Sequence, residues 1–331
     1  GEDSGYDRQI RLTPARRAQP EWSGIEISWD DFGAQLAKSR DGIEKIYNVW
    51  SDLDEFEIAS HYDLLQELAA AIRRLSETRA AMESLITKPQ ANGIYWVSIN
   101  KNNGNIAVHV APLHVGELLQ KKLFADKEAV ILTSATLRIG TDFTYIKSRL
   151  GIGDWSDEYA VGSPFDYKSA VMVYVPTDMP EPGQQGYQKT VETALIDLLR
   201  ATQGRTLVLF TSHSQLQATY RAITRPLEED GIIVIAQNLD GSRRQVLETF
   251  KTQERTVLLG TRSFWEGVDV VGDALSCLVI ARLPFAVPSD PIFAARSETF
   301  EDSFGQYSVP EAVLRFRQGF GRLIRTKTDR G

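Results

Sequence analysis

The stretch TVLLGTRSFWEGVD, residues 256–269, combines the two features that decide how this chain folds. It begins with an almost continuously apolar run, and hydroxyl and charged side chains follow directly after Gly260. A strand that covers only one face of a sheet alternates apolar and polar residues, whereas a strand buried on both faces is apolar throughout. The stretch therefore predicts a parallel strand, buried on both faces, with a polar loop at its carboxyl end.

Five other segments repeat this apolar pattern, and segments with helical periodicity lie between several of them. We expect strands at residues 129–133, 171–175, 206–210, 232–236, 256–260 and 277–281. We expect amphipathic helices at residues 187–203, 214–224 and 242–253. Alternation of buried strands and helices predicts an α/β fold in which helices flank a parallel sheet.

A helical region and a hairpin are predicted before this pattern. Residues 1–29 are expected to be irregular or briefly extended, because prolines interrupt them. Residues 30–86 carry apolar side chains at helical spacing on both sides of the acidic segment 52–57, which predicts a long antiparallel helical pair. The β-rich runs 94–99 and 106–110 are separated by a turn sequence, and predict a β-hairpin.

Composition excludes several classes of protein. Of the 331 residues 42% are hydrophobic and 24% charged, as in ordinary globular proteins. No apolar run approaches the roughly 18 residues that span a bilayer. The single cysteine, Cys277, excludes an internal disulfide and a four-cysteine metal site, and the four histidines lack ligand spacing, so we expect no metal site and a cytoplasmic location. The net charge of −7 means that any nucleic acid must bind in a local groove.

Hydroxyl and charged residues follow four of the expected strands, where ligands of parallel sheets bind. These residues are Thr133, Ser134 and Thr136 after the first strand, Thr211 to Ser214 after the third, Thr261, Ser263, Glu266 and Asp269 after the fifth, and Arg282 after the sixth. Hydroxyls and backbone N–H groups donate hydrogen bonds to phosphate oxygens. Each serine or threonine taken singly is explained equally well as a helix N-cap.

The sequence QGFGRLIR, residues 318–325, ends the apolar pattern near the C-terminus. A helix from Val313 to Arg325 would place Gln318, Arg322 and Arg325 on one edge, where a carboxamide and two guanidinium groups suit a polyphosphate. Two glycines in this helix would cost about 1 kcal/mol each relative to alanine, which a close approach to the backbone would justify. The alternative is that both arginines pair with surface acids.

Five segments together resemble motifs III to VI of superfamily-2 helicases of the XPD/DinG branch. They are ILTSATL (131–137), LVLFTSH (207–213), GTRSFWEGVDVVG (260–272), RLPFAVPSDP (282–291) and QGFGRLIR (318–325). The resemblance covers residues 93–331 strongly and residues 1–92 weakly. It implies a RecA-like parallel sheet flanked by helices, with an N-terminal helical insertion.

The resemblance also implies roles for individual residues. Arginines that reach the γ-phosphate of ATP from the second motor domain would be Arg322 and Arg325. Residues that bind the nucleotide would be Gln318, Glu266, Gly267 and Asp269. Residues toward the nucleic-acid backbone would be Ser212, Thr261 and Ser263. Residues that couple ATP hydrolysis to motion would be Thr133, Ser134 and Thr136.

By the same resemblance, residues 1–92 would be part of an arch-like helical insertion. Residues 93–150 would end the first motor domain, and residues 151–331 would form a second motor domain that is truncated at its C-terminus. No GxxxxGK[ST] phosphate loop and no DEAH-type acidic box occur in the sequence. We therefore expect the C-terminal part of a larger helicase, unable to hydrolyse ATP alone, with the Mg²⁺ ligands and any iron–sulfur cluster outside this chain.

The function implied is ATP-dependent translocation on single-stranded DNA, in the 5′→3′ direction, in DNA repair or replication. Protein partners are not predicted. An alternative is a regulator that binds single-stranded nucleic acid without catalysis. A nucleotide-binding metabolic enzyme is disfavoured, because Gly151 and Gly153 lack the third glycine and the following helix of a dinucleotide fingerprint.

Overall fold

A computed structural model describes residues 8–53, 60–265, 270 and 272–331 of the chain. These residues form two compact units. One unit contains Gly116–Val287 and Ser297–Gly331, and the other contains the described residues up to Val115 together with residues 288–296. The three domains expected from the sequence, with boundaries at residues 92 and 150, follow the family resemblance and remain a prediction.

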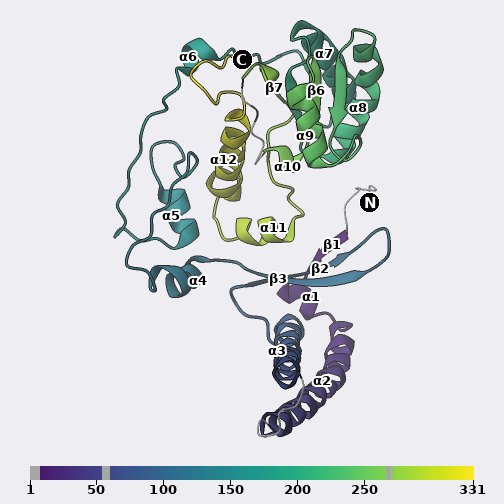
Figure 1. Cartoon of the computed structure of the whole chain (residues 1–331), viewed down its shortest axis with the longest axis vertical. Helices are drawn as coiled ribbons and strands as arrows, with labels where there is room; N and C mark the ends of the chain where they lie inside the picture. The colour runs from purple at the N-terminus through teal and green to yellow at the C-terminus, as the bar shows by residue number, and fades with distance from the viewer. Residues whose placement is uncertain (1–7, 54–59, 266–269, 271) are drawn as a thin grey trace. The chain divides into compact units, whose positions relative to one another are not determined.

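The first unit is built on a four-stranded sheet in which every pair of neighbouring strands is parallel (Figure 1). The strand order is β5-β6-β4-β7. The strands are β4 (Thr206–Leu209), β5 (Ile233–Ala236), β6 (Thr256–Gly260) and β7 (Cys277–Ile280). The sheet helices are α7 (Tyr187–Ala201), α8 (His213–Glu228) and α9 (Arg243–Thr252). The predicted α/β fold is confirmed, and these four strands and three helices lie where the apolar pattern placed them.

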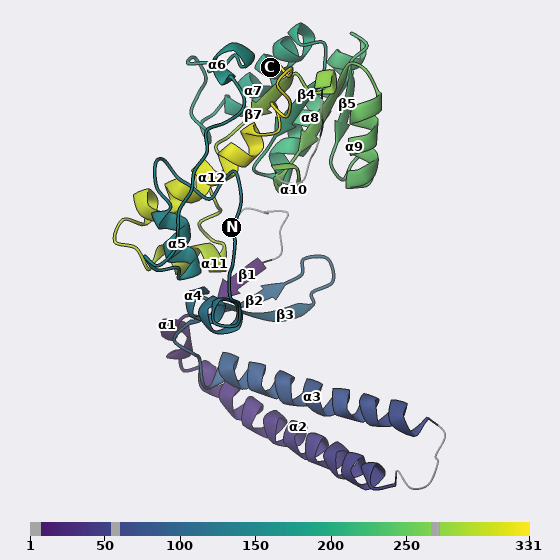
Figure 2. The ribbon, with the colours of Figure 1, turned by 60° about the vertical axis from the view of Figure 1, so that its left-hand side comes forward.

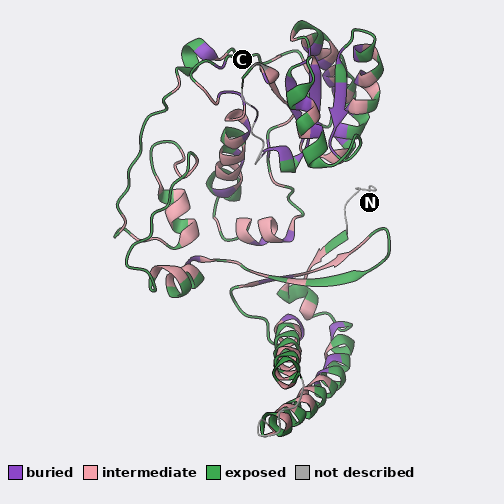
Figure 3. Ribbon diagram, viewed as in Figure 1, coloured by how far each residue is buried: buried purple, intermediate pink, exposed green. Residues whose placement is uncertain are grey.

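Both faces of the sheet are buried, as the continuous apolar runs require (Figure 3). Val208 of β4 packs in one cluster with residues of α7 and α8, such as Leu199 and Leu216. Leu207, its neighbour in β4, packs in a second cluster with residues of α9, such as Phe250. All four residues of β4 are buried, so β4 has no polar face.

The strands expected at residues 129–133 and 171–175 are not formed, so this part of the prediction is wrong. Both segments are extended and solvent-exposed; Ile131 is 89% exposed and Met172 is 82% exposed. The amide of Met172 donates to the carbonyl of Gly331, and the amide of Gly331 donates to Ala170. Apolar composition predicts that a segment can be a strand, but a strand also needs a neighbour along its whole length, and neither segment has one among the described residues.

The second unit contains the predicted helical pair, α2 (Trp22–Ser51) and α3 (His61–Ile86), which lie side by side in Figures 1 and 2. The expectation of irregular structure to residue 29 is wrong, because α2 begins at Trp22 and is preceded by β1 (Arg8–Arg11) and α1 (Pro14–Arg17). Pro14 lies in the first turn of α1, where the missing N–H costs no helical hydrogen bond.

The predicted hairpin is also confirmed. β2 (Gly93–Ile99) and β3 (Ile106–Pro112) pair antiparallel, and β1 adds to β2 to give a three-stranded sheet. The base of the helical pair packs against this hairpin, since Trp22, Trp29 and Tyr95 share one buried cluster with the end of α3.

Short elements complete the fold. They are α4 (Gly116–Leu119), the π-helix Gln120–Phe124, α5 (Thr144–Leu150), α6 (Tyr167–Ala170), α10 (Arg262–Trp265), the 3₁₀ turn Gly272–Ala274, α11 (Pro291–Ser297), the π-helix Phe304–Ser308 and α12 (Val309–Phe320). Within the described residues, every helix is too short or too polar to cross a membrane.

Gly319, near the end of α12, contacts the ring of Trp265. A Cβ atom at residue 319 would lie 2.8 Å from Cε3 and 2.9 Å from Cζ3 of Trp265, closer than carbon atoms approach without repulsion. The close approach that would justify a glycine in this helix is therefore present, and it joins α12 to the buried end of α10.

We predict that Gly319→Ala destabilises the protein by about 1–3 kcal/mol, because the buried indole cannot move away without disturbing its neighbours. The matched control is Gly42→Ala in α2, where a Cβ atom meets nothing within 4 Å and the better helix propensity of alanine should stabilise by up to about 1 kcal/mol. Urea unfolding followed by circular dichroism measures both changes. Equal unfolding midpoints for wild type and Gly319→Ala would contradict the contact.

Candidate functional site

Three strand ends meet at the carboxyl edge of the sheet through Thr261, which follows β6. The amide and the hydroxyl of Thr261 both donate to the side-chain oxygen of Gln237, each at 2.9 Å, and the hydroxyl lies 3.3 Å from Nε2 of His213. Gln237 follows β5, and His213 begins the helix after β4. Thr261 is buried, so its side chain orders this edge of the sheet.

Gln237 was not among the residues singled out from the sequence. The signal was present, because Gln237 is the polar residue directly after a continuously apolar run, the same pattern that identified Thr261. The spacing of the sequence could not show that its side chain turns toward the neighbouring strand.

The two predicted serines differ in environment. Ser212 is the N-cap of α8: its hydroxyl accepts from the amide of Gln215 at 3.2 Å and lies 3.3 Å from the hydroxyl of Ser214. The N-cap explanation therefore holds for Ser212. Ser263 lies on α10 with its side chain exposed. Contact of Ser212, Thr261 and Ser263 with nucleic acid remains a prediction.

Arg322 is joined to this edge through Trp265. The indole N–H of Trp265 donates to the carbonyl of Phe210, the residue after β4, at 3.3 Å. The carbonyl of Trp265 in turn accepts from Nε of Arg322 at 3.2 Å and from Nη2 at 3.1 Å. Two donors on one acceptor fix the plane of the guanidinium group beside the strand ends. Glu266, Gly267 and Asp269, the predicted nucleotide-binding residues that follow Trp265, lie outside the described residues.

The predicted helix through Arg325 is wrong, because α12 ends at Phe320 and Gly321 is its C-cap. Gln318 is half-buried in the last turn of α12, Arg322 lies in the turn that follows, and Arg325 lies beyond that turn. The three side chains therefore do not share one helix edge.

The carboxylate of Asp329 explains why no helix continues through Arg325. One oxygen accepts the amides of Arg325 and Thr326, each at 2.7 Å, and the other accepts the hydroxyl of Thr326 at 2.7 Å. In a continued helix the amide of Arg325 would bond to the carbonyl four residues earlier. Asp329 supplies a charged acceptor in its place, and Leu323 and Ile324 are buried in the core just before it.

Asp329 is ionised because these bonds outweigh its burial. Burial favours the neutral acid and acts to raise the pKa of Asp329, but the hydroxyl of Thr326 and the amides of Arg325, Thr326 and Gly272 lower it, and the net pKa lies below the ordinary value. Gly272 belongs to the 3₁₀ turn before β7, so the carboxylate joins that turn to the one that carries Arg325.

Of the three hydroxyl residues at the end of the segment 129–133 and just after it, Ser134 and Thr136 form a small turn instead of a strand end. The hydroxyl of Ser134 accepts from the amide of Thr136 at 3.1 Å and lies 3.1 Å from the hydroxyl of Thr136, while Thr133 is exposed. Their coupling role remains a prediction.

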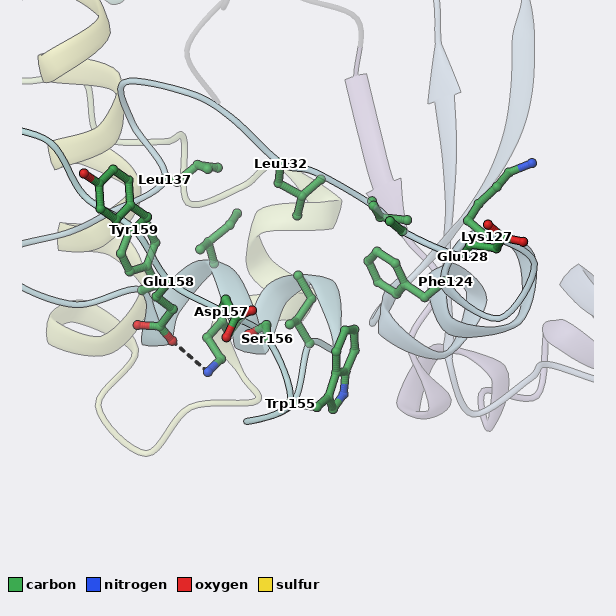
Figure 4. A pocket seen from close by; sticks show the side chains of 16 residues that line it. Phe124, Lys127, Glu128, Leu132, Leu137, Trp155, Ser156, Asp157, Glu158 and Tyr159 are labelled. Atoms are coloured by element: carbon green, nitrogen blue, oxygen red, sulfur yellow. Dashed lines mark hydrogen bonds and ion pairs between the residues drawn. The ribbon is translucent and has the colours of Figure 1, made fainter.

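A hollow of about 320 Å³ lies beside the extended segment 129–132 (Figure 4). Phe124, Leu132 and Trp155 give it apolar walls, and the bond from Lys147 to Glu158, 2.8 Å long, lies at its edge. None of the predicted site residues lines it.

The parallel sheet flanked by helices is the α/β arrangement of a RecA-like domain. Residues 195–331 match the family model of the helicase C-terminal domain. Together with the similar proteins described next, this match supports an XPD/DinG-like superfamily-2 helicase, of which the chain is the C-terminal part. The resemblance seen in the sequence is thereby confirmed.

Relatives show the same assignment. The chain is 35% identical over 279 residues to the Bacillus subtilis protein named 3'-5' exonuclease DinG, covering 81% of this chain and 30% of that protein. It is 34% identical over 276 residues to the ATP-dependent DNA helicase YoaA of Haemophilus influenzae, covering 82% of this chain and 40% of the relative. It is 34% identical over 277 residues to the ATP-dependent helicase DinG of Mycobacterium tuberculosis, covering 80% of this chain and 41% of the relative. The chain thus spans less than half the length of these relatives.

A solved structure titled XPD_Helicase has a similar fold, with a TM-score of 0.53 and 13% sequence identity. The match covers 82% of this chain and 51% of that one. At this identity the likeness shows the fold alone.

We predict that Asp329→Asn lowers stability at pH 7 by about 1–3 kcal/mol, because hydrogen bonds to a charged acceptor are replaced by weaker ones. The folded pKa is lowered, so the contribution of the carboxylate is complete above the unfolded value of about 4 and is lost as pH falls through the folded pKa. The stability difference between wild type and variant should therefore shrink below about pH 4.

Urea unfolding at several pH values measures this difference. Asp157→Asn, at an exposed position, removes one negative charge elsewhere and is the control. A stability difference for Asp329→Asn that does not change between pH 7 and pH 3 would show that the ionised carboxylate does not hold the turn.

Proposed function

We propose that this chain supplies the second motor domain of an ATP-dependent DNA helicase that moves along single-stranded DNA. The Haemophilus influenzae YoaA and the Mycobacterium tuberculosis DinG are named ATP-dependent helicases, whereas the Bacillus subtilis DinG is named a 3'-5' exonuclease. Residues 195–331 match the helicase C-terminal domain. Movement in the 5′→3′ direction, a role in DNA repair or replication, and a cytoplasmic location belong to the same proposal.

The observation that carries the proposal is the pair of hydrogen bonds that Nε and Nη2 of Arg322 donate to the carbonyl of Trp265. It holds a guanidinium group at the edge of a parallel sheet where ligands of such folds bind. A positive group held in place before the reaction can stabilise charge that builds on a transferring phosphoryl group, without reorganisation at the moment of reaction.

ATP is the nucleotide in this proposal, with Arg322 and Arg325 as residues that reach its γ-phosphate and Gln318 as a nucleotide contact. Bound ATP would supply the phosphoryl group and the free energy for movement. Mg²⁺ accompanies ATP in such reactions. The described residues contain no cluster of three or more His, Cys, Asp or Glu side chains suited to a metal ion.

Single-stranded DNA is the proposed substrate, with Ser212, Thr261 and Ser263 near its backbone and Glu266, Gly267 and Asp269 between DNA and nucleotide. Ser263 supports this best, because its hydroxyl is exposed on α10 beside the strand ends. Thr261 would act through the order that it gives the edge, since its amide and its hydroxyl both donate to Gln237.

The alternative is a regulator that binds single-stranded nucleic acid without catalysis. Such a regulator would bind nucleic acid at the same edge of the sheet, and Arg322 and Arg325 would have no role in catalysis. The two functions differ in whether the intact protein that contains this chain turns over ATP in an arginine-dependent way.

We predict that Arg322→Ala or Arg325→Ala in the intact protein lowers kcat for ATP hydrolysis by about a thousandfold or more while the Kd for ATP changes little, because an arginine finger acts mainly in the transition state. Arg→Lys should restore little, since an ammonium group lacks the planar fork that binds two oxygens. Steady-state turnover and nucleotide binding are measured on each variant, after circular dichroism has shown that it is folded.

Arg330→Ala is the control, because this exposed arginine lies close by in sequence and donates to the carbonyls of Lys327 and Asp329. A Kd about a hundredfold weaker with kcat unchanged would make the arginines ground-state anchors. Unchanged kcat and Kd would favour the explanation that they are surface residues.

We also predict that the 331-residue chain binds single-stranded DNA at micromolar concentration or weaker, and that binding weakens as salt rises, because contacts to phosphates release counterions. Ser263→Asp should weaken binding further by placing a negative charge at the exposed hydroxyl. Ser39→Asp, on the exposed surface of α2, is the charge-matched control. Fluorescence anisotropy with single-stranded and duplex oligonucleotides measures these affinities, and tight, salt-insensitive duplex binding would contradict the proposal.

A further inference from the structure

Arg317, an exposed residue one position before Gln318, joins α12 to the loop Ser134–Arg138. Its Nη1 donates to the carbonyl of Arg138, and its Nη2 donates to the carbonyl of Ala135 at 3.3 Å. These residues are about 180 positions apart in sequence and lie in the same compact unit. No feature of the sequence singled out Arg317, because its spacing from Gln318 places it on a different side of α12.

The loop is shaped so that one guanidinium group can hold it. Ser134 closes the turn by accepting the amide of Thr136, and Ile139 and Asp142 exchange backbone bonds just after it at 3.2 and 3.4 Å. The carbonyls of Ala135 and Arg138 are then the acceptors that meet the two arms of Arg317. A planar fork can satisfy two separate carbonyls at once, whereas an ammonium group cannot present two donors in that fixed geometry.

Helix α5, which follows the loop in sequence, is also bonded to the region of α12. The hydroxyl of Tyr145, in α5, donates to Glu311 near the start of α12 at 2.5 Å, and Arg315 donates to the other oxygen of Glu311 at 3.4 Å. Burial and the carboxylate of Glu311 raise the pKa of Tyr145, so it stays a neutral donor. Arg149 lies over the ring of Tyr307, 5.5 Å from its centre. Two sets of contacts, at opposite ends of α12, therefore bind residues 134–149 to this helix.

We propose that Arg317 is a positioning residue that ties the Ser134–Arg138 loop to α12, so that the hydroxyls of Ser134 and Thr136 move together with the helix that leads to Arg322 and Arg325. The proposal rests on the proposed function for its consequence: a displacement of α12, when Arg322 and Arg325 beyond its end engage a phosphate, reaches the loop through the hydrogen bonds of Arg317. Rigid elements joined by hydrogen bonds carry such displacements, and removing a joint uncouples them.

The tie itself is tested on the 331-residue chain by hydrogen exchange. In Arg317→Ala the amides of Thr136 and Ile139, which report the closed loop, should exchange at least about fivefold faster, because local opening becomes easier. Amides of β4 should keep their wild-type rates, which excludes general unfolding. Arg317→Lys should lie close to alanine, and Arg330→Ala should match wild type. Unchanged exchange at Thr136 and Ile139 in Arg317→Ala overturns the proposal.

The consequence is tested on the intact protein by the ratio of DNA strand separation to ATP hydrolysed. Arg317→Ala should lower this ratio at least about fivefold, whereas a variant that is merely less stable lowers both rates in parallel. An unchanged ratio with faster loop exchange would show that the tie exists but positions nothing, which also overturns the proposal. If the wild-type intact protein hydrolyses no ATP, the proposed function fails, and the hydrogen exchange alone decides whether Arg317 holds the loop.

Discussion

Burial of β4 on both faces is the constraint on which the sheet unit depends. Its four residues are buried between the α7–α8 layer and the layer that contains Phe250 and Phe264. Because β4 is central, with β6 on one side and β7 on the other, its register aligns the carboxyl ends of its neighbours. The polar side chains of Thr206 and Thr256 stand at the first positions of β4 and β6, and those of Gln237 and Thr261 meet at the opposite edge, where β5 and β6 end.

The same constraint positions Arg322. Trp265 packs into the core with Leu209 and Leu323, and its N–H bonds to the end of β4. Its carbonyl is left at the surface of that core, where Arg322 binds it. Gly319 is required by the same ring, since any side chain there would collide with it. Trp265 thus positions Arg322: its ring packs into the core, and its carbonyl accepts the hydrogen bonds of the guanidinium group.

Sequence reasoning succeeded where local pattern and tertiary environment agree. The continuous apolar runs of β4 to β7 predict burial on both faces; the central strands β4 and β6 are buried throughout, whereas the outer strands β5 and β7 are buried in part. It failed where a segment needed a partner that periodicity cannot show. Residues 129–133 and 171–175 have the composition of strands but no strand alongside them among the described residues. Residues 321–325 have helical spacing, but the amide of Arg325 bonds to Asp329 and not to a helical carbonyl. The hydrogen-bonding partners Gln237 and Arg317 were missed for the same reason, because a side chain's direction is set by what it packs against.

The sequence by itself determined the class of fold and the family resemblance, because buried parallel strands and the order of five motifs are written in consecutive residues. Only the tertiary structure decided that α12 stops at Phe320, that Asp329 holds the backbone of Arg325, and that Arg317 joins α12 to the loop Ser134–Arg138. The amide of Arg325 bonds to Asp329 and not to a helical carbonyl, and Arg317 bonds to carbonyls far away in the sequence. Which partner each group meets depends on how the chain packs, here with Leu323, Ile324 and Trp265 in one core cluster, and consecutive residues do not show that packing.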